Sequence, residues 1–233
     1  MRFFIFFGEN MQRYILNNET KKFSENDIHH IKNVMRMKEN DLVVVCYENQ
    51  CYQAKLIFND NKIDYEIIKE LPKKDTLDIT LIQGSLKGSK IETTIKYATI
   101  FGARTIIITE FERSIAKLKN SDYKLNRYNQ IAKEAAELSK RNNITNIEFA
   151  NNLSKIDYGK YDLVILADEE EKELTLSNLD LSKIKSQKLA IIIGPEGGIT
   201  NNERKLLEKQ NVEKITLGEY IYPAEIASLK LLA

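Results

Sequence analysis

Cysteine and histidine are scarce in this 233-residue sequence, which contains two of each. Cys46 and Cys51 form no CxxC motif and no cluster with histidine, which argues against a zinc site and against a disulfide scaffold. So few cysteines are typical of a protein of the reducing cytoplasm. His29 and His30 have no nucleophile beside them in sequence, so a serine or cysteine triad has little support.

Long apolar runs and nucleotide-binding motifs are also missing. The apolar stretch Phe3–Phe7 is too short for a signal peptide core or a membrane span. The loop Gly84–Lys90 has three residues between its glycines instead of four and ends in Gly-Ser-Lys, so it does not fit a phosphate loop. No G-x-G-x-x-G motif follows the first strand of the α/β region, which disfavours a standard dinucleotide fold.

The overall amino-acid composition is typical of a globular protein. Hydrophobic residues make up 42% and charged residues 30% of the chain, and the length suits one large or two small domains. The net charge is only +1, but within residues 71–150 Lys and Arg outnumber Asp and Glu. A local basic face can bind phosphates even when the whole chain is nearly neutral.

Residues 1–71 are predicted to form a small barrel-like β module with one helix. The candidate strands are Arg2–Phe7, Gln12–Leu16, Leu42–Tyr47, Cys51–Asn59 and Lys62–Lys69, and they are separated by polar turns. The helix is predicted to begin after Ser24, with Ile28, Ile31, Val34 and Met35 at helical spacing. The boundary with the second domain, residues 72–233, is placed near Leu71–Asp75.

Residues 72–233 alternate between strand and helix patterns, which predicts a parallel sheet flanked by helices. The predicted strands are Leu77–Gln83, Thr105–Thr109, Asn146–Ala150, Asp162–Ala167, Leu189–Ile193 and Lys214–Leu217. The predicted helices are Ser89–Phe101, Ser121–Arg141, Ser177–Ile184, Asn202–Asn211 and Ala224–Ala233.

The stretch from Lys188 to Gly198 is the strongest candidate for a ligand site. Leu189–Ile193 is a continuous apolar run, which is typical of a strand buried on both faces. The loop Gly194–Gly198 carries little side-chain bulk, so a ligand can approach its backbone closely. Thr200 and Glu203 then have the spacing of a capping box that begins a helix. Ligands in open α/β sheets bind outside the carboxyl ends of strands, where this loop lies.

Several short motifs, taken together, resemble one known family. They are Arg2-Phe3-Phe4, His29-His30-Ile31 with Val34-Met35-Arg36, Leu86-Lys87-Gly88, Phe101-Gly102-Ala103, Glu112-Arg113-Ser114, Glu134–Glu137 with Ser139 and Arg141, Ile193–Gly198, Leu217-Gly218 and Ala224–Ala227. The most specific is Gly-Pro-Glu-Gly-Gly after a buried strand, with Leu-Gly about twenty residues later. The chain resembles the RsmE family, SPOUT-class methyltransferases that methylate N3 of a uridine in 16S rRNA of the small ribosomal subunit.

The resemblance implies a fold and a cofactor. The fold would be a small N-terminal PUA-like RNA-binding β-barrel followed by a SPOUT α/β domain with a C-terminal trefoil knot. The protein would be a cytoplasmic homodimer that needs neither a metal nor a membrane, and S-adenosylmethionine (AdoMet) would bind in the knot loops. The implied cofactor-binding residues are Leu166, Ala167, Gly194, Pro195, Glu196, Gly197, Gly198, Leu217, Gly218, Ile221 and Tyr222.

The resemblance also suggests roles in catalysis and in RNA binding. Uridine N3 is mostly protonated at neutral pH, so a side chain must take its proton or stabilise the uracil anion. Glu225 is the candidate for handling this proton, and Arg113 for stabilising the anion. The candidate RNA-binding residues are Arg2, His30, Arg36, Lys87, Arg113, Lys117 and Arg141.

Four positions depart from the family pattern. Pro223 stands where an arginine is usual and Ile226 where a threonine is usual, while Leu138 replaces a glutamine and Ile100 an acidic residue. Pro223 motivates one alternative, a catalytically weakened or inactive RNA-binding factor of ribosome assembly that keeps the fold and the AdoMet loop. The other alternative is a knotted methyltransferase of tRNA ribose, against which the N-terminal module and the whole-chain match argue.

Overall fold

The computed structural model describes residues 11–59, 62–73, 77–118, 122–180, 182, 184 and 186–233, and the chain divides into two compact units. Unit 1 comprises Met1–Asp75 together with Ala136–Ile144, and unit 2 comprises Thr76–Ala135 together with Thr145–Ala233. The segment Ala136–Ile144 therefore belongs to unit 1, although it lies in the middle of the sequence of unit 2. The predicted domain boundary between residues 71 and 72 stays a prediction.

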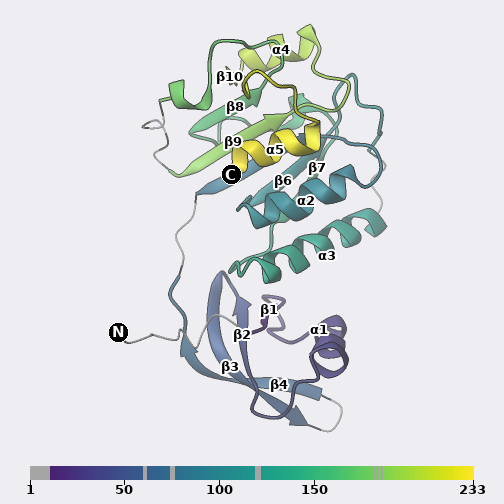
Figure 1. The fold of residues 1–233 in the computed structure, drawn as a ribbon, viewed down its shortest axis with the longest axis vertical. Helices are drawn as coiled ribbons and strands as arrows, with labels where there is room; N and C mark the ends of the chain where they lie inside the picture. Colours follow the sequence, from purple (N-terminus) through teal and green to yellow (C-terminus); the bar gives the residue numbers. More distant parts are fainter. Residues whose placement is uncertain are drawn as a thin grey trace. The chain divides into compact units, whose positions relative to one another are not determined.

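Unit 1 is built on a four-stranded sheet in the order β1-β2-β3-β4 (Figure 1). Its strands are β1 (Arg13–Ile15), β2 (Leu42–Tyr47), β3 (Gln50–Asn59) and β4 (Lys62–Glu70). β1 pairs with β2 in parallel, and the other pairs are antiparallel. These four strands confirm the predicted ones, whereas the predicted strand Arg2–Phe7 lies outside the described residues. Within the described part of unit 1, β1 and β4 are the sheet edges, so closure into a barrel stays a prediction.

Helix α1 (Glu25–His29) begins where the sequence predicts. The Ser24 hydroxyl accepts the Asp27 backbone N–H, and the Asp27 carboxylate accepts the Ser24 backbone N–H at 2.9 Å, which completes a capping box. The chain then widens into a π-helical turn, His30–Val34. The predicted apolar spacing holds only in part, because Ile31 is buried whereas Val34 is 57% exposed. A π turn changes the angle between successive residues, which breaks a 3.6-residue pattern.

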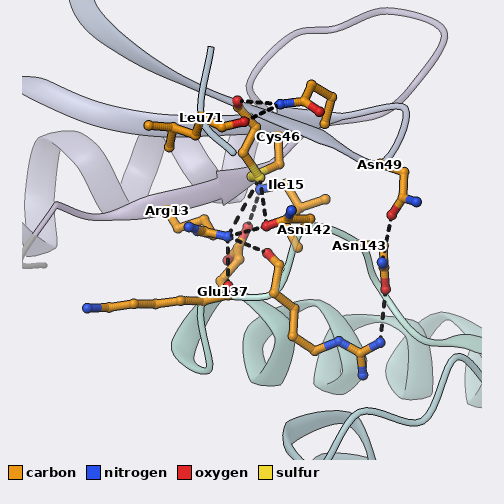
Figure 2. Close-up of a disulfide and its surroundings, with 12 residues drawn as sticks. Arg13, Ile15, Cys46, Asn49, Leu71, Glu137, Asn142 and Asn143 are labelled. Atoms are coloured by element: carbon orange, nitrogen blue, oxygen red, sulfur yellow. Dashed lines mark hydrogen bonds between the residues drawn. A yellow bond between two sulfur atoms is a disulfide. The ribbon is translucent and has the colours of Figure 1, made fainter. Parts of the chain in front are cut away.

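The two cysteines form a disulfide in the hairpin of β2 and β3, which the sequence analysis did not expect. Cys46 and Cys51 are direct partners in the antiparallel register and both are buried. Sequence spacing alone does not reveal this pairing, because it depends on where the hairpin turns. Figure 2 shows that the bond lies against the segment of residues 136–144, where the Asn142 Oδ1 is 3.2 Å from the Cys51 sulfur.

Unit 2 contains a six-stranded sheet in which every pairing is parallel. Its strands are β5 (Asp78–Gly84), β6 (Thr105–Thr109), β7 (Asn146–Ala150), β8 (Leu163–Ala167), β9 (Lys188–Ile193) and β10 (Glu213–Ile215). Their order is β10-β8-β9-β5-β6-β7. The parallel sheet is therefore confirmed, and β9 lies between β8 and β5 (Figure 1). Five of its six residues are buried, as expected of a strand covered on both faces.

Four helices accompany the sheet strands along the chain. They are α2 (Lys90–Ile100), α3 (Asp122–Leu138), α4 (Asn201–Glu208) and α5 (Ala224–Leu232), and α5 packs beside α2. The end of α3, from Ala136 on, belongs to unit 1. The structure also contains short 3-10 turns at Leu153–Lys155 and Leu176–Asn178. None of the helices in the described part of the chain is long and apolar enough to span a membrane.

The helix predicted over Ser177–Ile184 is wrong in its described part. A single 3-10 turn, Leu176–Asn178, stands near its start, and residues 181 and 183 lie outside the described residues. Short polar side chains bond to nearby backbone instead: Asn178 Oδ1 accepts the Thr175 N–H and Asp180 Oδ1 accepts the Ser182 N–H. Such local bonds compete with helix formation, and the apolar spacing did not reveal them.

Candidate functional site

The loops that follow three neighbouring strands of unit 2 enclose a cavity. β10, β8 and β9 are adjacent and parallel, so their carboxyl ends lie at the same edge of the sheet. The cavity has a volume of about 400 Å³, within the range of small-molecule sites. It is lined by Lys90, Ala167, Asp168, Glu169, Lys172, Ile193, Gly194, Pro195, Glu196, Gly198, Ile199, Thr216, Leu217, Gly218, Glu219, Tyr220, Ile221, Tyr222, Pro223, Ala224 and Ala227.

The loop after β9 is packed so tightly that its glycines have no room for a side chain. A Cβ on Gly194 would lie 2.8 Å from Ile199 Cγ1, and a Cβ on Gly198 would lie 2.6 Å from Glu169 Oε1. Gly198 also has φ of +74°, which L residues rarely adopt. The glycines therefore let the loop pack closely against Ile199 and Glu169, while Gly194 and Gly198 line the cavity without side chains.

The loop after β5, which the sequence excludes as a phosphate loop, packs against the loop after β9, and Lys90 at its end lines the cavity. A Cβ on Gly84 would lie only 2.5 Å from the Pro195 backbone nitrogen, so the two loops touch backbone to backbone. The Lys87 backbone N–H donates to Glu196 Oε1 at 3.3 Å. Parallel pairing of β5 with β9 brings these loops together, even though more than one hundred residues separate them.

The first turn of α4 fixes the loops that surround the cavity. Thr200 caps the helix as predicted, and its backbone N–H donates to Glu203 Oε2 at 2.8 Å. The other oxygen of Glu203 accepts the Glu112 backbone N–H at 2.7 Å, which holds the loop after β6. The buried Glu203 carboxylate thus accepts the backbone N–H groups of both Thr200 and Glu112. This anchors the loop that carries Arg113 to the start of α4.

Arg204 holds the loop after β8 from the same helix. Its guanidinium donates to both oxygens of Asp168 at 2.8 Å and to the Ile199 carbonyl at 2.7 Å. Both side chains of the ion pair are almost completely buried. Burial would raise the pKa of Asp168, but the Arg204 guanidinium and the Glu170 backbone N–H outweigh it and lower that pKa. The pair thus connects two cavity-lining segments through charged groups.

Most of the predicted cofactor-binding residues line this cavity. They are Ala167, Gly194, Pro195, Glu196, Gly198, Leu217, Gly218, Ile221 and Tyr222. Leu166 and Gly197 do not line it. The side chain of Leu166 points into the hydrophobic core, since strand residues alternate between faces. Gly197 faces Arg113 instead, because a Cβ there would lie 2.7 Å from the Arg113 carbonyl oxygen.

Glu225, the predicted proton-handling residue, lies beside the cavity in the first turn of α5. Its Oε1 is 3.4 Å from Lys90 Nζ. Its Oε2 is buried and has no hydrogen-bond partner within the described part of the chain. Arg113 donates to the Gly197 carbonyl at 3.4 Å. Neither Glu225 nor Arg113 is among the residues that line the cavity.

The predicted RNA-binding residues fall into both units. In unit 2, Lys87 and Arg113 flank the glycine loop, and Lys117 pairs with Glu110 at 3.2 Å. In unit 1, His30 Nδ1 lies 3.0 Å from the Tyr14 hydroxyl, Arg36 is exposed, and Arg141 donates to Asn143 at 2.9 Å. Arg2 lies outside the described residues.

Three charged residues near the site were not predicted as functional from the sequence: Lys90, Glu203 and Arg204. Glu203 was recognised only as a helix cap. Lys90 stood at the end of the rejected phosphate loop, and no local pattern singles out Arg204. Each of these side chains contacts an element that is distant in the sequence. Periodicity and residue spacing describe local structure, so they do not predict such contacts. Among the described residues, no three His, Cys, Asp or Glu side chains gather in a way that could hold a metal ion.

Comparisons with known proteins identify the domains of this chain. An RNA methyltransferase domain model matches residues 73–233, and an RNA methyltransferase PUA domain model matches residues 23–79. The ribosomal RNA small subunit methyltransferase E of Bacillus subtilis is 30% identical over 249 residues, covering 96% of this chain and 95% of its own. Its counterpart in Rickettsia conorii is 29% identical, covering 93% and 89%.

A solved structure has the same fold. The ribosomal RNA small subunit methyltransferase E of Neisseria gonorrhoeae, bound to S-adenosyl methionine, superposes with a TM-score of 0.81 at 23% identity and covers 95% of each chain. The family model spans more than half of the sequence, and the similarity to the Bacillus protein runs through both units. The chain therefore belongs to the ribosomal RNA small subunit methyltransferase E family, with a PUA-like N-terminal domain and an α/β methyltransferase domain.

Proposed function

We propose that the protein transfers a methyl group from AdoMet to N3 of a uridine in the 16S rRNA of the small ribosomal subunit. The observation that carries this proposal is the cavity of about 400 Å³ walled by the loops after β8, β9 and β10. It brings together nine of the eleven residues that the family resemblance assigns to AdoMet. Family membership then indicates the reaction and the class of RNA.

The lining residues fit AdoMet in shape and in charge. Gly194 and Gly198 line the cavity and carry no side chains, so a cofactor meets their backbone there. The carboxylates of Glu169, Glu196 and Glu219 line the same cavity together with the ammonium groups of Lys90 and Lys172, which suits a ligand that carries a sulfonium, an ammonium and a carboxylate. When bound, AdoMet supplies an electrophilic methyl carbon and leaves as a neutral thioether.

The chain's own residues then orient the base and move one proton. The target uridine leaves its stack to reach the cavity, which costs least for an unpaired nucleotide. The Glu225 carboxylate, in the first turn of α5 beside the cavity, accepts the proton of the uracil N3–H, and its Oε2 has no hydrogen-bond partner in the described part of the chain. Arg113, whose guanidinium has one long bond to Gly197, donates to a uracil oxygen as negative charge develops.

The finer features of the family form part of the same proposal. The loops after β8, β9 and β10 would belong to a C-terminal trefoil knot, and two copies would form a homodimer in the cytoplasm, where ribosomal subunits are found. The exposed apolar side chains of Tyr220 and Ile221, 76% and 83% accessible, support a dimer that covers this rim of the cavity. Unit 1 would hold the RNA by its shape and by contacts that include Arg36 and Arg141.

Pro223 supports the second candidate function, an RNA-binding assembly factor without methyl transfer. It lines the cavity where the family usually has an arginine. A proline at this position supplies neither charge nor a backbone donor. If that arginine is required for transfer, this chain would retain AdoMet binding and lose the reaction.

The test is transfer of labelled methyl from AdoMet to small subunits that lack the modification, followed by nucleoside analysis. Label in 3-methyluridine, and a roughly 100-fold lower rate for Glu225→Gln, is the expected result. AdoMet binding in calorimetry without any transfer would favour the assembly factor. In a parallel reaction with tRNA in place of the subunits, label in a 2′-O-methylated nucleotide would contradict both candidates.

A further inference from the structure

Lys90 is a charged residue of the cavity to which neither the motifs nor the proposed reaction assigns a role. It is the first residue of α2 and follows the loop that packs against Gly194 and Pro195. Its side chain is 41% exposed and lines the cavity. Lys90 is therefore close to the reacting groups and is not a core residue.

The ammonium of Lys90 lies between two carboxylates from different elements. Its Nζ is 3.5 Å from Glu196 Oε1, on the loop after β9, and 3.4 Å from Glu225 Oε1, in the first turn of α5. The Lys87 backbone N–H donates to the same oxygen of Glu196. Since α5 packs beside α2, the side chain of Lys90 connects both helices to the glycine loop.

The two carboxylate oxygens of Glu225 have different surroundings. Oε1 faces the ammonium, whereas Oε2 is buried without a hydrogen-bond partner in the described residues. A buried carboxylate oxygen without a partner is costly, so the ammonium of Lys90 at Oε1 is the contact that stabilises this carboxylate beside the cavity. The pKa of Lys90 itself is raised: burial lowers it, but the bonds to Glu225 and Glu196 outweigh that effect. The side chain is therefore a cation at neutral pH.

We propose that Lys90 is a positioning residue for methyl transfer, which holds the Glu225 carboxylate by Oε1 and fixes its orientation beside the cavity. The proposal rests on the proposed function. Without the ammonium, the carboxylates of Glu196 and Glu225 would repel each other, and the orientation of Glu225 would no longer be fixed. Lys90 thus acts through Glu225 and does not itself take the proton.

The experiment compares Lys90→Gln, Lys90→Arg, Glu225→Gln and the Lys90→Gln/Glu225→Gln double variant in the same methyl-transfer assay, at saturating AdoMet and with unmodified small subunits. Lys96→Gln is the matched control, because Lys96 lies on the same helix and is exposed away from the carboxylates, with its ammonium 5.6 Å from the Tyr97 ring centre. Calorimetry gives the Kd for AdoMet of each variant, and circular dichroism confirms that each is folded.

We expect Lys90→Gln to lower kcat about tenfold while the Kd for AdoMet changes less than about threefold, because ground-state binding is retained. Lys90→Arg should restore most of the rate. The double variant should be no slower than Glu225→Gln alone, since Lys90 acts through that carboxylate, and a merely structural role would not produce this result.

Two outcomes would overturn the inference, and they are distinguishable. A kcat for Lys90→Gln within twofold of the wild type, with the wild type active, would overturn the role of Lys90 alone. A wild-type protein that binds AdoMet and transfers no methyl would overturn the proposed function and this inference with it.

Discussion

Gly84 is the residue whose missing side chain matters most for the shape of the site. A Cβ there would lie 2.5 Å from the Pro195 nitrogen and 2.8 Å from the Gly194 carbonyl carbon, and both are backbone atoms that cannot rotate away. We expect Gly84→Ala to displace the glycine loop, to lower the free energy of unfolding by roughly 1–3 kcal/mol and to weaken AdoMet binding. Urea unfolding and calorimetry measure the two effects.

Gly159→Ala is the matched control for that substitution. A Cβ at Gly159 would meet only Asp157 Oδ1 at 3.5 Å, which is an ordinary contact. Its stability and its AdoMet affinity should stay close to those of the wild type. Equal losses in both variants would show that contact between the loops after β5 and β9 does not shape the cavity.

The contribution of an ion pair to the free energy of unfolding depends on its burial, as Arg204 illustrates. Arg204→Ala leaves the buried Asp168 without its guanidinium, so we expect a loss of roughly 3–5 kcal/mol in the free energy of unfolding. The exposed pair of Arg127 with Glu92, at 2.7 Å, is the control, and Arg127→Ala should cost less than about 1 kcal/mol. Similar losses from both substitutions, in urea unfolding, would contradict the structural role given to Arg204.

The same pair predicts how stability depends on pH. Burial alone would raise the pKa of Asp168, but Arg204 and the Glu170 N–H lower it below its value in the unfolded chain. The unfolded state therefore binds the proton first, so this stabilisation is present above the ordinary aspartate pKa of about 4 and is lost as the pH falls through the lowered pKa. Urea titrations from pH 6 down to about pH 3 should show a steeper loss in the wild type than in Arg204→Ala. If the free energies of unfolding of the wild type and Arg204→Ala fall in parallel with pH, the Asp168–Arg204 pair does not contribute this pH dependence.

The hairpin of β2 and β3 is an element whose stability depends on a bond that the sequence did not predict. A disulfide between Cys46 and Cys51 closes a short loop, which in the chain-entropy model stabilises by roughly 2 kcal/mol. We expect reductant to lower the free energy of unfolding of the wild type by that amount. In the reduced state the Cys51 thiol can donate to Asn142 Oδ1, which lies 3.2 Å away, so the hairpin keeps this polar contact.

A Cys46→Ala/Cys51→Ala variant serves as the control for the disulfide, because its stability should not respond to reductant. Urea unfolding with and without dithiothreitol, together with alkylation and mass measurement, makes the comparison. A wild type whose cysteines are alkylated completely before reduction would contradict the bond.

Elements were predictable where a local pattern specified them. β6 and β7 match their predicted bounds, because β6 is a β-branched run and β7 alternates between polar and apolar residues. The cap of α4 follows from the spacing of Thr200 and Glu203. The site was only partly predictable, because the contact of Gly84 with Pro195 and the position of Lys90 between two glutamates depend on strand order. Strand order in a parallel sheet is a long-range property that neither propensity nor periodicity contains.

At the scale of the whole molecule, unit 1 is completed by a segment from the distant end of α3. The Arg13 guanidinium donates to the carbonyls of Lys140 and Arg141 at 2.7 and 2.8 Å, and the Ile15 N–H donates to Glu137 Oε1 at 2.8 Å (Figure 2). Ala136 packs in the same hydrophobic cluster as the disulfide. The PUA-like sheet therefore buries part of its polar and apolar surface against residues that its own stretch of sequence does not supply.

This arrangement predicts that residues 1–75 do not fold alone. The fragment would leave the partly buried Arg13 without its carbonyl acceptors, and each lost partner costs roughly 1–3 kcal/mol. A domain of this size has little stability to lose, since small domains bury less of their surface. A fusion of residues 1–75 to residues 136–144 through a flexible linker should regain a cooperative unfolding transition, observed by circular dichroism in urea. If the fragment alone unfolds with the same midpoint as the fusion, the segment is not needed, and unit 1 would be an independent domain.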